Sequence, residues 1–545
     1  MKIRIILYCF IPILFGCKHE KFLFTEVSDD IGLKYHYPGN DYEELGAGII
    51  VIDVNNDGWE DIFQASGIFK SKLWINNNGV FEDKTEDFNL QILDSMYVFG
   101  GSSGDYNNDG YTDLFIGNLG IKKLRGDGKP PILLKNVNGE YFEEDTLTIF
   151  PKNGSFHGCS WGDVNNDGFI DLYLPNYVEK FLAFKVPGPQ KKSRYEPTCL
   201  ENYFFLNHNG IRFTDATKEY NLNDSGCGLS SCFTDYDNDN DVDLMLLNDF
   251  AIWTLKGNRI FKNVGGKQKY EDISKKIGFY DEFYGMGIGP GDMDSDGILD
   301  YYLSNLGANR LMKNHIDTII NVSKEQGVDV ELVNENKTGT SWSGIFLDIN
   351  NDIKQDLYVS KGHLEIFENI VVLDENKMFL NKGTHYEDIS NISGANDPCS
   401  QRGAATLDYD HDGDLDIVVG TIKMRRGEFG KLNQKIKVFR NNNRTKNNWI
   451  RIKLIGDSGV NRDCLGCSVT ISLENNTKKI IREVDGGSGH SSQSSKILHF
   501  GLGSEKFAKN IEIQWLGKET QKIEKLKAGR VYEIFYKGDI SIIDY

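Results

Sequence analysis

The stretch Asp53-Val-Asn-Asn-Asp57-Gly-Trp-Glu-Asp61 carries oxygen-bearing side chains at positions 1, 3, 5 and 9 and a glycine at position 6. The same nine-residue pattern occurs seven times, starting at residues 53, 105, 163, 235, 292, 348 and 408, so the unit recurs every 52 to 72 residues. A unit of this size is typical of one blade of a β-propeller or one turn of a solenoid. The chain is therefore expected to be an array of one repeated structural unit.

Oxygen ligands at alternate positions are what a hard cation requires. The glycine permits a sharp turn, so side-chain oxygens and one backbone carbonyl can approach a single ion to about 2.3–2.6 Å. Calcium fits better than magnesium, which takes fewer protein ligands and retains several waters. An EF-hand needs Glu at position 12, where the first two copies have Gln64 and Ile116. The flanking runs Ile49–Ile52 and Asp113–Ile116 are β-branched and aromatic, which predicts calcium loops between β-strands.

The candidate metal ligands are the residues at positions 1, 3, 5, 7 and 9 of each loop, except position 7 of the sixth loop, and up to seven calcium ions are expected. In chain order they are Asp53, Asn55, Asp57, Trp59, Asp61, Asp105, Asn107, Asp109, Tyr111, Asp113, Asp163, Asn165, Asp167, Phe169, Asp171, Asp235, Asp237, Asp239, Asp241, Asp243, Asp292, Asp294, Asp296, Ile298, Asp300, Asp348, Asn350, Asp352, Asp356, Asp408, Asp410, Asp412, Asp414 and Asp416.

The alternative for a single loop is an Asp/Asn/Gly turn without metal, because these residues favour tight turns in any case. Seven copies in the same phase argue against that interpretation. Two copies lack the glycine, with Asn240 in the fourth loop and Ile353 in the sixth. Asn tolerates a left-handed backbone, whereas β-branched Ile does so poorly, so the sixth loop is predicted to bind metal weakly or not at all.

The acidity of the chain agrees with metal binding. The formal net charge is −19, and positions 1, 3, 5 and 9 of the seven loops hold 24 carboxylates. Carboxylates gathered so closely raise one another's pKa unless a cation lies among them. Nucleic acid is excluded as a partner, because binding it requires clustered Lys and Arg.

The amino terminus predicts export and a lipid anchor. Met1–Arg4 is basic, the apolar stretch from Ile5 to Gly16 is too short to span a bilayer, and Leu14-Phe-Gly-Cys17 resembles a bacterial lipobox. Residues 1–16 are therefore interpreted as a lipoprotein signal peptide and Cys17 as the lipidated residue, the alternative being an ordinary signal peptide. The expected location is the cell envelope, at the outer membrane, with the lipid as the only membrane contact.

Each loop is followed by a second recurring phrase, which predicts another hairpin. Leu73–Asn76 runs to Val80–Asp83, and Phe379–Asn381 runs to Tyr386–Asp388, in each case around an Asn/Gly turn. Two strands flanking the loop and two in the hairpin make four strands per unit, so residues 17–445 are predicted to form a seven-bladed β-propeller. Phe22–Val27 resembles the hairpin phrase without a loop and is expected to complete the last blade.

Two insertions interrupt the repeat. Residues 177–198 contain a basic Pro/Gly stretch, and residues 315–340 are polar with a helical tendency. Loops of this length often carry function, although solvated decoration is the alternative.

From residue 446 the pattern changes to strands with alternating polarity, among them Trp449–Leu454, Ser468–Leu473 and Val531–Phe535. Residues 446–540 are predicted to form a small β-sandwich, so the fold class is all-β. Seven cysteines follow Cys17, an odd number, and a local bridge between Cys227 and Cys232 is one possibility among several connectivities. Cys464 and Cys467 lack the second pair that a zinc site needs.

The repeat resembles FG-GAP/VCBS repeats such as those of the integrin α propeller, through the seven loops and the Gly-containing runs before them, for example Gly46-Ala-Gly48 and Gly285-Met-Gly287. The tail resembles the ASPIC/UnbV domain through Asn461-Arg462, Gly486–Gly489 and His499-Phe-Gly-Leu-Gly503. The combination is similar to the cartilage acidic protein family over nearly the whole mature chain. Cys464, Cys467 and His490 depart from that pattern.

The resemblance implies a calcium-stabilised, non-catalytic binding or adhesion module that recognises a surface protein or a glycan. The loop carboxylates are occupied by metal in this interpretation, and the sequence contains no nucleophile elbow, P-loop or zinc signature. One rival is a glycan-processing or glycan-binding enzyme that uses His157, Tyr177, His363 and Arg402 near the blade tops. Another is an envelope assembly component whose tail domain docks a partner.

Overall fold

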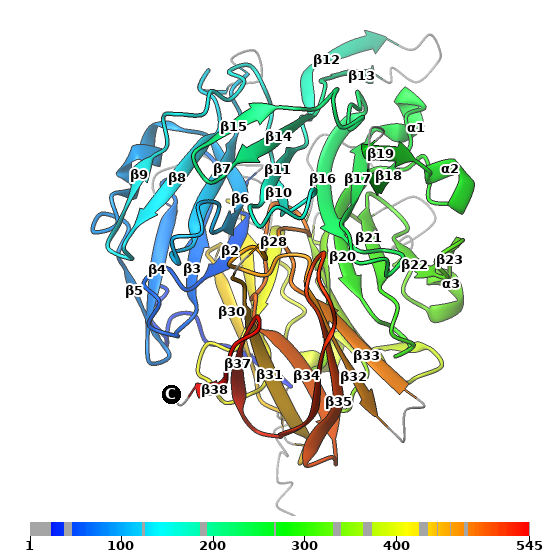
Figure 1. Ribbon diagram of the computed structural model, residues 1–545. Helices are drawn as coiled ribbons and strands as arrows, with labels where there is room; N and C mark the ends of the chain where they lie inside the picture. Colours follow the sequence, from blue (N-terminus) through cyan, green and yellow to red (C-terminus); the bar gives the residue numbers. More distant parts are fainter. Residues whose placement is uncertain are drawn as a thin grey trace, which may run out of the picture.

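The computed structural model describes residues 23–37, 46–121, 126–185, 193–265, 269–330, 339–362, 373–423, 434–443, 445–457, 459–473 and 478–543. The predicted signal peptide, Cys17 and His363 lie outside these ranges. The described chain is all-β (Figure 1), and its helices are short: η1 (Leu90–Ser95), α1 (Ala251–Thr254), α2 (Ser274–Ile277), α3 (Ser323–Gln326) and α4 (Ser390–Ser393). None of these helices has the length and apolar character needed to cross a membrane.

Strands between residues 24 and 441 form seven four-stranded antiparallel sheets. Sheet 1 contains β2 (Ile49–Ile52), β3 (Asp61–Gln64), β4 (Lys72–Asn77) and β5 (Val80–Asp83); sheet 2 contains β6 (Val98–Gly104), β7 (Asp113–Asn118), β8 (Ile132–Val137) and β9 (Tyr141–Glu144); sheet 3 contains β10 (Ser160–Gly162), β11 (Asp171–Leu174), β14 (Tyr203–His208) and β15 (Arg212–Asp215). Sheet 4 contains β16 (Cys227–Thr234), β17 (Asp243–Asp249), β18 (Arg259–Gly265) and β19 (Lys269–Asp272); sheet 5 contains β20 (Gly285–Gly291), β21 (Asp300–Asn305), β22 (Arg310–Asn314) and β23 (Ile319–Asn321). Sheet 6 contains β24 (Ser341–Leu347), β25 (Asp356–Lys361), β26 (Lys377–Asn381) and β27 (Tyr386–Asp388); sheet 7 contains β28 (Gln401–Leu407), β29 (Asp416–Thr421), β30 (Lys437–Asn441) and β1 (Phe24–Glu26).

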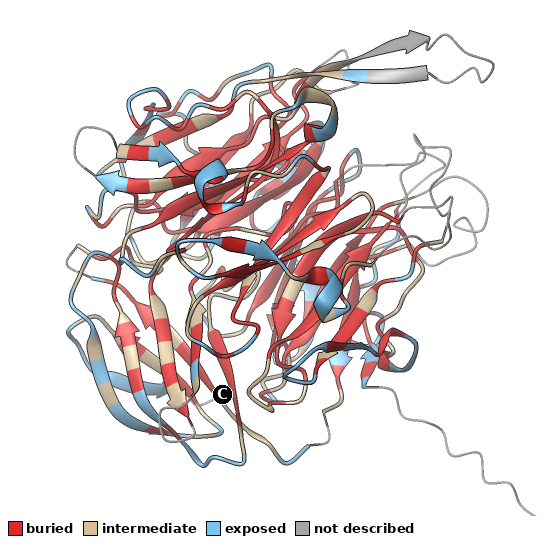
Figure 2. Ribbon diagram, turned by 90° about the vertical axis from the view of Figure 1, so that its right-hand side faces the viewer, coloured by how far each residue is buried: buried red, intermediate tan, exposed pale blue. Residues whose placement is uncertain are grey.

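Burial explains the residue types of these strands. The first two strands of sheet 1, β2 and β3, are buried throughout; β2 is entirely apolar and β3 has Ile62 and Phe63 at its centre, as expected for strands covered on both faces. The fourth strand, β5, buries only Phe81 and exposes its acidic residues, because it lies at the outer edge. Figure 2 shows the same gradient, with buried strands inside and exposed residues on the outer strands and short helices.

The seven sheets are linked one to the next by a repeated asparagine at the end of the third strand. Its side-chain amide donates to the carbonyl of the second loop residue in the preceding sheet. Asn76 of sheet 1 makes the same bond to Tyr409 of sheet 7, at 2.9 Å. The hydrogen bonds therefore run in a cycle that joins the last sheet to the first.

The predicted role of the amino-terminal phrase in completing the last unit is confirmed for its described part. β1 pairs with β30, Phe24 lying opposite Asn441, and it supplies the fourth strand of sheet 7. This pairing covers the edge of β30 with a strand from the other end of the repeat array.

The carboxy-terminal segment forms two four-stranded sheets. One has the order β34-β31-β37-β38 and the other β33-β32-β35-β36. The bounds are β31 (Asn448–Ile455), β32 (Ser468–Leu473), β33 (Lys478–Glu483), β34 (Leu498–Gly503), β35 (Phe507–Gln514), β36 (Gln521–Lys527), β37 (Val531–Phe535) and β38 (Ile540–Ile543). β31 pairs in parallel with β37, and Figure 1 places these sheets at one end of the seven-sheet array.

Residues 485–495, here named the central segment, leave the carboxy-terminal sheets and contact all seven sheets of the array. The hydrogen bonds are Gln493 with Ile49 and Val51, Gln493 with Ser103, Gly486 with Trp161, Gly489 with Ser230, Gly489 with Ile288, His490 with Ser343, and Ser495 with Thr406. A Cβ on Gly48 or Gly100 would lie 2.1 or 2.3 Å from the Ser491 carbonyl oxygen. These two glycines are therefore required by the close approach of the central segment.

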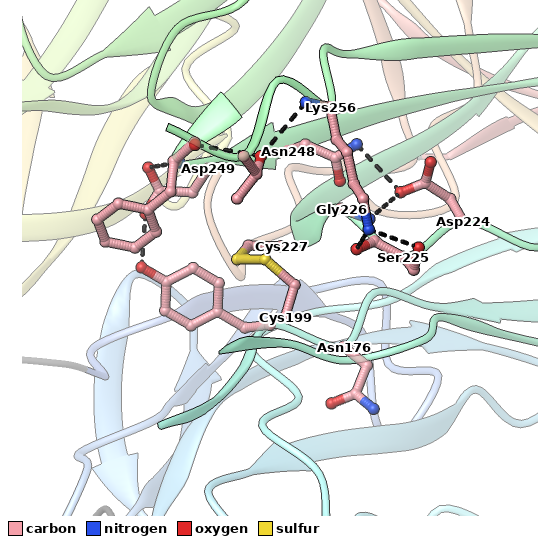
Figure 3. The surroundings of a disulfide bond; sticks show 12 residues. Asn176, Cys199, Asp224, Ser225, Gly226, Cys227, Asn248, Asp249 and Lys256 are labelled. Atoms are coloured by element: carbon pink, nitrogen blue, oxygen red, sulfur yellow. Dashed lines mark hydrogen bonds between the residues drawn. A yellow bond between two sulfur atoms is a disulfide. The ribbon is translucent and has the colours of Figure 1, made fainter. Parts of the chain in front are cut away.

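The insertion at residues 177–198 is largely a β-hairpin. β12 (Val178–Lys185) pairs with β13 (Ser193–Cys199), and Figure 1 shows this hairpin at the end opposite the carboxy-terminal sheets. A disulfide between Cys199 and Cys227 fastens the base of the hairpin to β16 (Figure 3). The proposed Cys227–Cys232 bridge is therefore wrong: Cys232 lies on the same extended strand, and its thiol is free and buried. The described part of the second insertion, residues 315–330 and 339–340, contains β23 and the single-turn helix α3.

Candidate metal centres

Each nine-residue repeat forms a loop between the first two strands of its sheet, as predicted, and the first loop shows the pattern. Asp53 accepts the backbone N–H of Asp57 through Oδ1 and that of Gly58 through Oδ2, both at 3.1 Å. Asp57 Oδ1 accepts the N–H of Trp59 at 2.8 Å. Asp61 accepts Val54 N–H through Oδ2 and Asn76 N–H through Oδ1. These bonds curl the chain so that the side chains at positions 1, 5 and 9 face the same interior.

The same bonds recur in the other loops. The first aspartate accepts the N–H of position 6 in every loop, and the fifth residue accepts the N–H of position 7. The ninth aspartate accepts the backbone N–H of the asparagine that ends the third strand. Sequence repetition therefore corresponds to repetition of geometry at all seven positions.

The sixth loop keeps this geometry despite its isoleucine. Ile353 has φ +88°, the left-handed region that Gly58 and Gly110 occupy at the same position with φ near +90°. Asp348 accepts the N–H groups of Asp352 and Ile353 at 3.0 and 2.8 Å. The isoleucine thus adds backbone strain without changing the loop, and the prediction of weak metal binding stays a prediction.

Burial makes the loop carboxylates costly to ionise. It raises the pKa of Asp53 and Asp292 to about 6, and that of the first aspartate of the other five loops to about 7. The ninth aspartates also have raised pKa values, again chiefly through burial, and that of Asp300 reaches about 8. A cation among these groups would supply the missing stabilisation of the charged forms.

Several loop oxygens lack a protein partner. Asp408 Oδ1 and Asp410 Oδ1 in the seventh loop, and Asp243 Oδ2 in the fourth, are buried and accept no hydrogen bond within the described chain. Ligand oxygens of three carboxylates lie within 4.8 Å of one another in the fourth, fifth and seventh loops, in the sets Asp235/Asp237/Asp239, Asp292/Asp294/Asp300 and Asp408/Asp410/Asp416. Converging carboxylate oxygens, some of which in the fourth and seventh loops are buried and accept no hydrogen bond within the described chain, fit a hard cation such as calcium.

Residues outside the predicted ligand set also shape the loops. The fourth loop residue has a left-handed backbone in all seven copies, and Asn56 and Asn108 each donate to the Gly carbonyl of the next loop. In the seventh loop this residue is His411, which stacks on Trp59 of the first loop with ring centroids 3.7 Å apart. Two asparagines recur in the repeat, one at loop position 4 and one at the end of the third strand. Their repetition in the sequence could have revealed that they link each loop to its neighbours.

The carboxy-terminal sheets pack against the loops. Asp463 accepts the N–H of Asp105, and Glu483 accepts the N–H of Asp235, both at 2.9 Å. Arg451 pairs with Asp408 at 3.1 Å and with Glu60 at 2.9 Å. The face that bears the loops is therefore covered in large part by the protein's own carboxy-terminal domain.

The residues considered for a rival catalytic site are partly brought together. His157 stacks on Phe99 and lies beside Tyr177, with ring centroids 3.7 and 5.0 Å apart, and His490 is 6.2 Å from it. Arg402 lies over Trp342, which contacts His490. Burial keeps the pKa of His157 well below its ordinary value, and Tyr177 donates to Asp249 at 2.5 Å. These groups form a packed aromatic cluster around the central segment.

Comparison with known proteins identifies two segments of the chain. Residues 53–116 and 105–174 match the FG-GAP-like repeat, and residues 457–540 match the ASPIC and UnbV domain. These matches show FG-GAP-like repeats and an ASPIC and UnbV domain in the chain, as the sequence predicted.

Among characterised proteins, the chain is similar to cartilage acidic protein 1. It is 23% identical to the human protein over 584 residues, an alignment that covers 98% of this chain and 78% of that protein. It is also 23% identical to the Xenopus tropicalis protein, and that alignment covers 92% of this chain and 74% of the relative. Integrin alpha-6 of Gallus gallus is 27% identical over 26% of this chain and 14% of the integrin. Among solved structures, the alignment with the V. cholerae biofilm matrix protein Bap1 covers 78% of this chain and 92% of that chain at 8% identity, with a TM-score of 0.37.

Proposed function

We propose that the seven sheets are the blades of one closed β-propeller, residues 17–445, and that residues 446–540 form a β-sandwich docked on it. The cyclic asparagine bonds and the pairing of β1 with β30 support closure, because a ring leaves few free sheet edges. The FG-GAP match supports a propeller of the integrin α type.

We further propose that the loops bind up to seven calcium ions and that the ions stabilise the propeller. The observation that carries this proposal is the convergence of carboxylate oxygens in loops of repeated geometry, together with buried oxygens of the fourth and seventh loops that accept no hydrogen bond within the described chain. The residues at positions 1, 3, 5 and 9, with the carbonyl of position 7, would hold the ion. Bound calcium would supply the charge that these carboxylates lack, and extracellular calcium modules commonly bind with dissociation constants of about 10⁻⁴–10⁻³ M.

The function that this arrangement supports best is non-catalytic binding or adhesion at the cell surface. The similarity to cartilage acidic protein 1 and, over a quarter of the chain, to integrin alpha chains favours this class over the glycan-processing alternative. Within the described chain the central segment contacts all seven sheets, so it would obstruct a polymer threaded along the axis between them. A surface protein or glycan is therefore expected to bind on the outside of the array.

The anchoring proposal rests on sequence alone. Leu14-Phe-Gly-Cys17 resembles a lipobox, and a lipid on Cys17 would hold the mature protein at the envelope, in our proposal at the outer membrane. Labelling cells with a fatty-acid analogue tests it: wild type would carry label and a Cys17→Ala variant would not.

Thermal unfolding of the mature chain, with millimolar calcium and with chelator, tests the calcium proposal when combined with metal analysis. Each site saturated to ten times its dissociation constant contributes about 1.4 kcal/mol by mass action. A large calcium-dependent rise in Tm with five or more ions per chain is the expected result. An unchanged Tm and no bound metal would overturn the proposal.

A further inference from the structure

In two of the loops, a lysine from the third strand of the same sheet contacts two or more loop carboxylates. In the fifth loop, Lys313 Nζ lies 2.8 Å from oxygens of both Asp294 and Asp296 and 3.4 Å from Asp300. Its side chain is only 7% exposed. In the fourth loop, Lys262 Nζ contacts Asp237 and lies 2.9 Å from Asp239. Each ammonium thus contacts the carboxylates at loop positions 3 and 5, the place where a bound cation would have its ligands.

The position of the repeat that these two lysines occupy is apolar in three other sheets. Lys262 and Lys313 directly precede the asparagine that ends the third strand, and the equivalent residues of sheets 1, 3 and 6 are Ile75, Leu206 and Leu380. Those three sheets have Asn at loop position 3, namely Asn55, Asn165 and Asn350. The fourth and fifth loops have Asp237 and Asp294 there. The additional carboxylate and the lysine therefore occur together.

Two sheets show that a basic residue at this position does not by itself enter the loop. In sheet 7, Arg440 is exposed and donates to Asn442 at 3.2 Å, and buried Asp408 and Asp410 oxygens of that loop stay without partners. In sheet 2, where position 3 is Asn107, Lys135 is 38% exposed and lies 3.7 Å from Asp109. The fourth and fifth loops are distinct because their ammonium groups contact two or three carboxylates at once.

We propose that Lys262 and Lys313 are built-in counter-cations that compete with calcium for the fourth and fifth loops. The inference rests on the proposed calcium binding of the loops and assigns the two lysines as the residues that set their affinity. An ammonium hydrogen-bonded to the ligand carboxylates must leave, or lose its bonds, before a divalent ion can use the same oxygens. These two loops consequently hold their shape with little calcium and fill at higher calcium concentrations than the first, third and seventh loops.

Substitution by methionine removes the charge while keeping a long apolar side chain. Lys262→Met and Lys313→Met are expected to tighten calcium binding at one loop each by at least about tenfold, because an opposite charge within about 4–6 Å commonly shifts carboxylate equilibria by 1–3 logarithmic units. Leu206→Lys is the reciprocal change and should weaken the third loop. The matched control is Lys377→Met, because Lys377 also lies on a third strand but pairs at 3.0 Å with Asp388, outside any loop.

The experiment is equilibrium dialysis of the chelator-stripped full chain against a calcium series, with bound calcium counted by elemental analysis. At a calcium concentration where wild type is partly loaded, each lysine variant should bind one more ion than wild type, Leu206→Lys one fewer, and Lys377→Met the same number. Wild type that binds no calcium up to millimolar concentrations would overturn the calcium proposal itself. Wild type that binds calcium, with unchanged isotherms in all three loop variants, would overturn only the role of the lysines. If the buried Lys313→Met variant does not fold, Lys262→Met and Leu206→Lys decide the question.

Discussion

Arg451 of β31 donates from Nη1 to Asp408 Oδ2 at 3.1 Å and from Nη2 to Glu60 Oε2 at 2.9 Å, and the three side chains are at most 5% exposed. Asp408 begins the seventh loop, and Glu60 lies in the first. One guanidinium of the carboxy-terminal domain therefore joins the two loops that meet where the last sheet adjoins the first.

Replacing this arginine should be strongly destabilising. Arg451→Met leaves two buried carboxylates without their partner, and breaking a buried pair in this way typically costs about 3–5 kcal/mol. Urea denaturation at fixed calcium should show that loss in the free energy of unfolding. Lys453→Met is the control, because Lys453 on the same strand makes a half-exposed 3.5 Å pair with Glu533, a type worth under about 1 kcal/mol. Equal effects of the two variants would contradict the importance of the buried pair.

Asn76→Ala tests the closure of the ring. The Asn76 amide donates to the carbonyls of Tyr409 and Glu60, and its oxygen accepts Gly79 N–H, all within a buried site. Truncation leaves these groups unsatisfied, which typically costs about 1–3 kcal/mol of unfolding free energy. Asn442→Ala, which removes an exposed bond to Thr25, should change stability far less. If Asn76→Ala leaves the free energy of unfolding in denaturant unchanged, the hydrogen bonds at this junction contribute little to stability.

Ile353→Asn should stabilise the protein by about 1 kcal/mol, because a β-branched residue in the left-handed region is strained and Asn tolerates that conformation. The fourth loop already contains Asn240 at this position, with φ +70°. Thermal melts in calcium would measure the gain, and Lys354→Asn, at the next position, is the control. A lower Tm for Ile353→Asn would mean that the packing of Ile353 beside Gly503 outweighs the strain.

The disulfide between Cys199 and Cys227 closes a chain segment with a sequence separation of 28 residues. In the chain-entropy model a loop of this length contributes about 3–4 kcal/mol, so the Cys199→Ser, Cys227→Ser double variant should unfold at a lower temperature. Reductant should lower the Tm of wild type toward that of the variant and leave the variant unchanged. If reductant lowers the Tm of both proteins equally, it acts on groups other than this disulfide.

Much of the fold could be predicted because its signals are local and repeated. The apolar runs beside the loops became the paired inner strands, and the Leu73–Asp83 phrase became β4 and β5. Strands β34, β36 and β38 were missed; in β36, Gln521–Lys527, only Leu526 is buried, so apolar alternation is weak. The bond between Gln493 and Ser103 joins residues 390 positions apart, and no local pattern predicts it. The entry of Lys313 into its loop likewise depends on which way one side chain points from β22.

The raised pKa values of the loop carboxylates predict that the stability of the folded protein changes with pH in opposite directions with and without calcium. In chelated protein, burial raises the pKa of Asp163 and Asp348 to about 7, whereas in the unfolded chain aspartate ionises near pH 4. A raised folded-state pKa contributes stability that is complete below the unfolded pKa and is lost as pH rises through the folded pKa. These aspartates should therefore make chelated protein more stable at pH 5.5 than at pH 8.

Calcium should reverse this trend, because protons and the ion compete for the same oxygens. The increase in Tm on adding calcium is expected to be largest at pH 8 and to shrink steadily toward pH 5.5. Burial also lowers the pKa of His490 to about 3, which removes stability as pH falls below about 6.5, but this histidine contacts Met286 and Ser343 and no loop. Its contribution is the same in both conditions and cancels in the calcium-dependent difference. Paired melts across this pH range therefore cancel the contributions of groups that do not contact the loops, and a calcium-induced shift that grew toward pH 5.5 would show that other groups bind the ion.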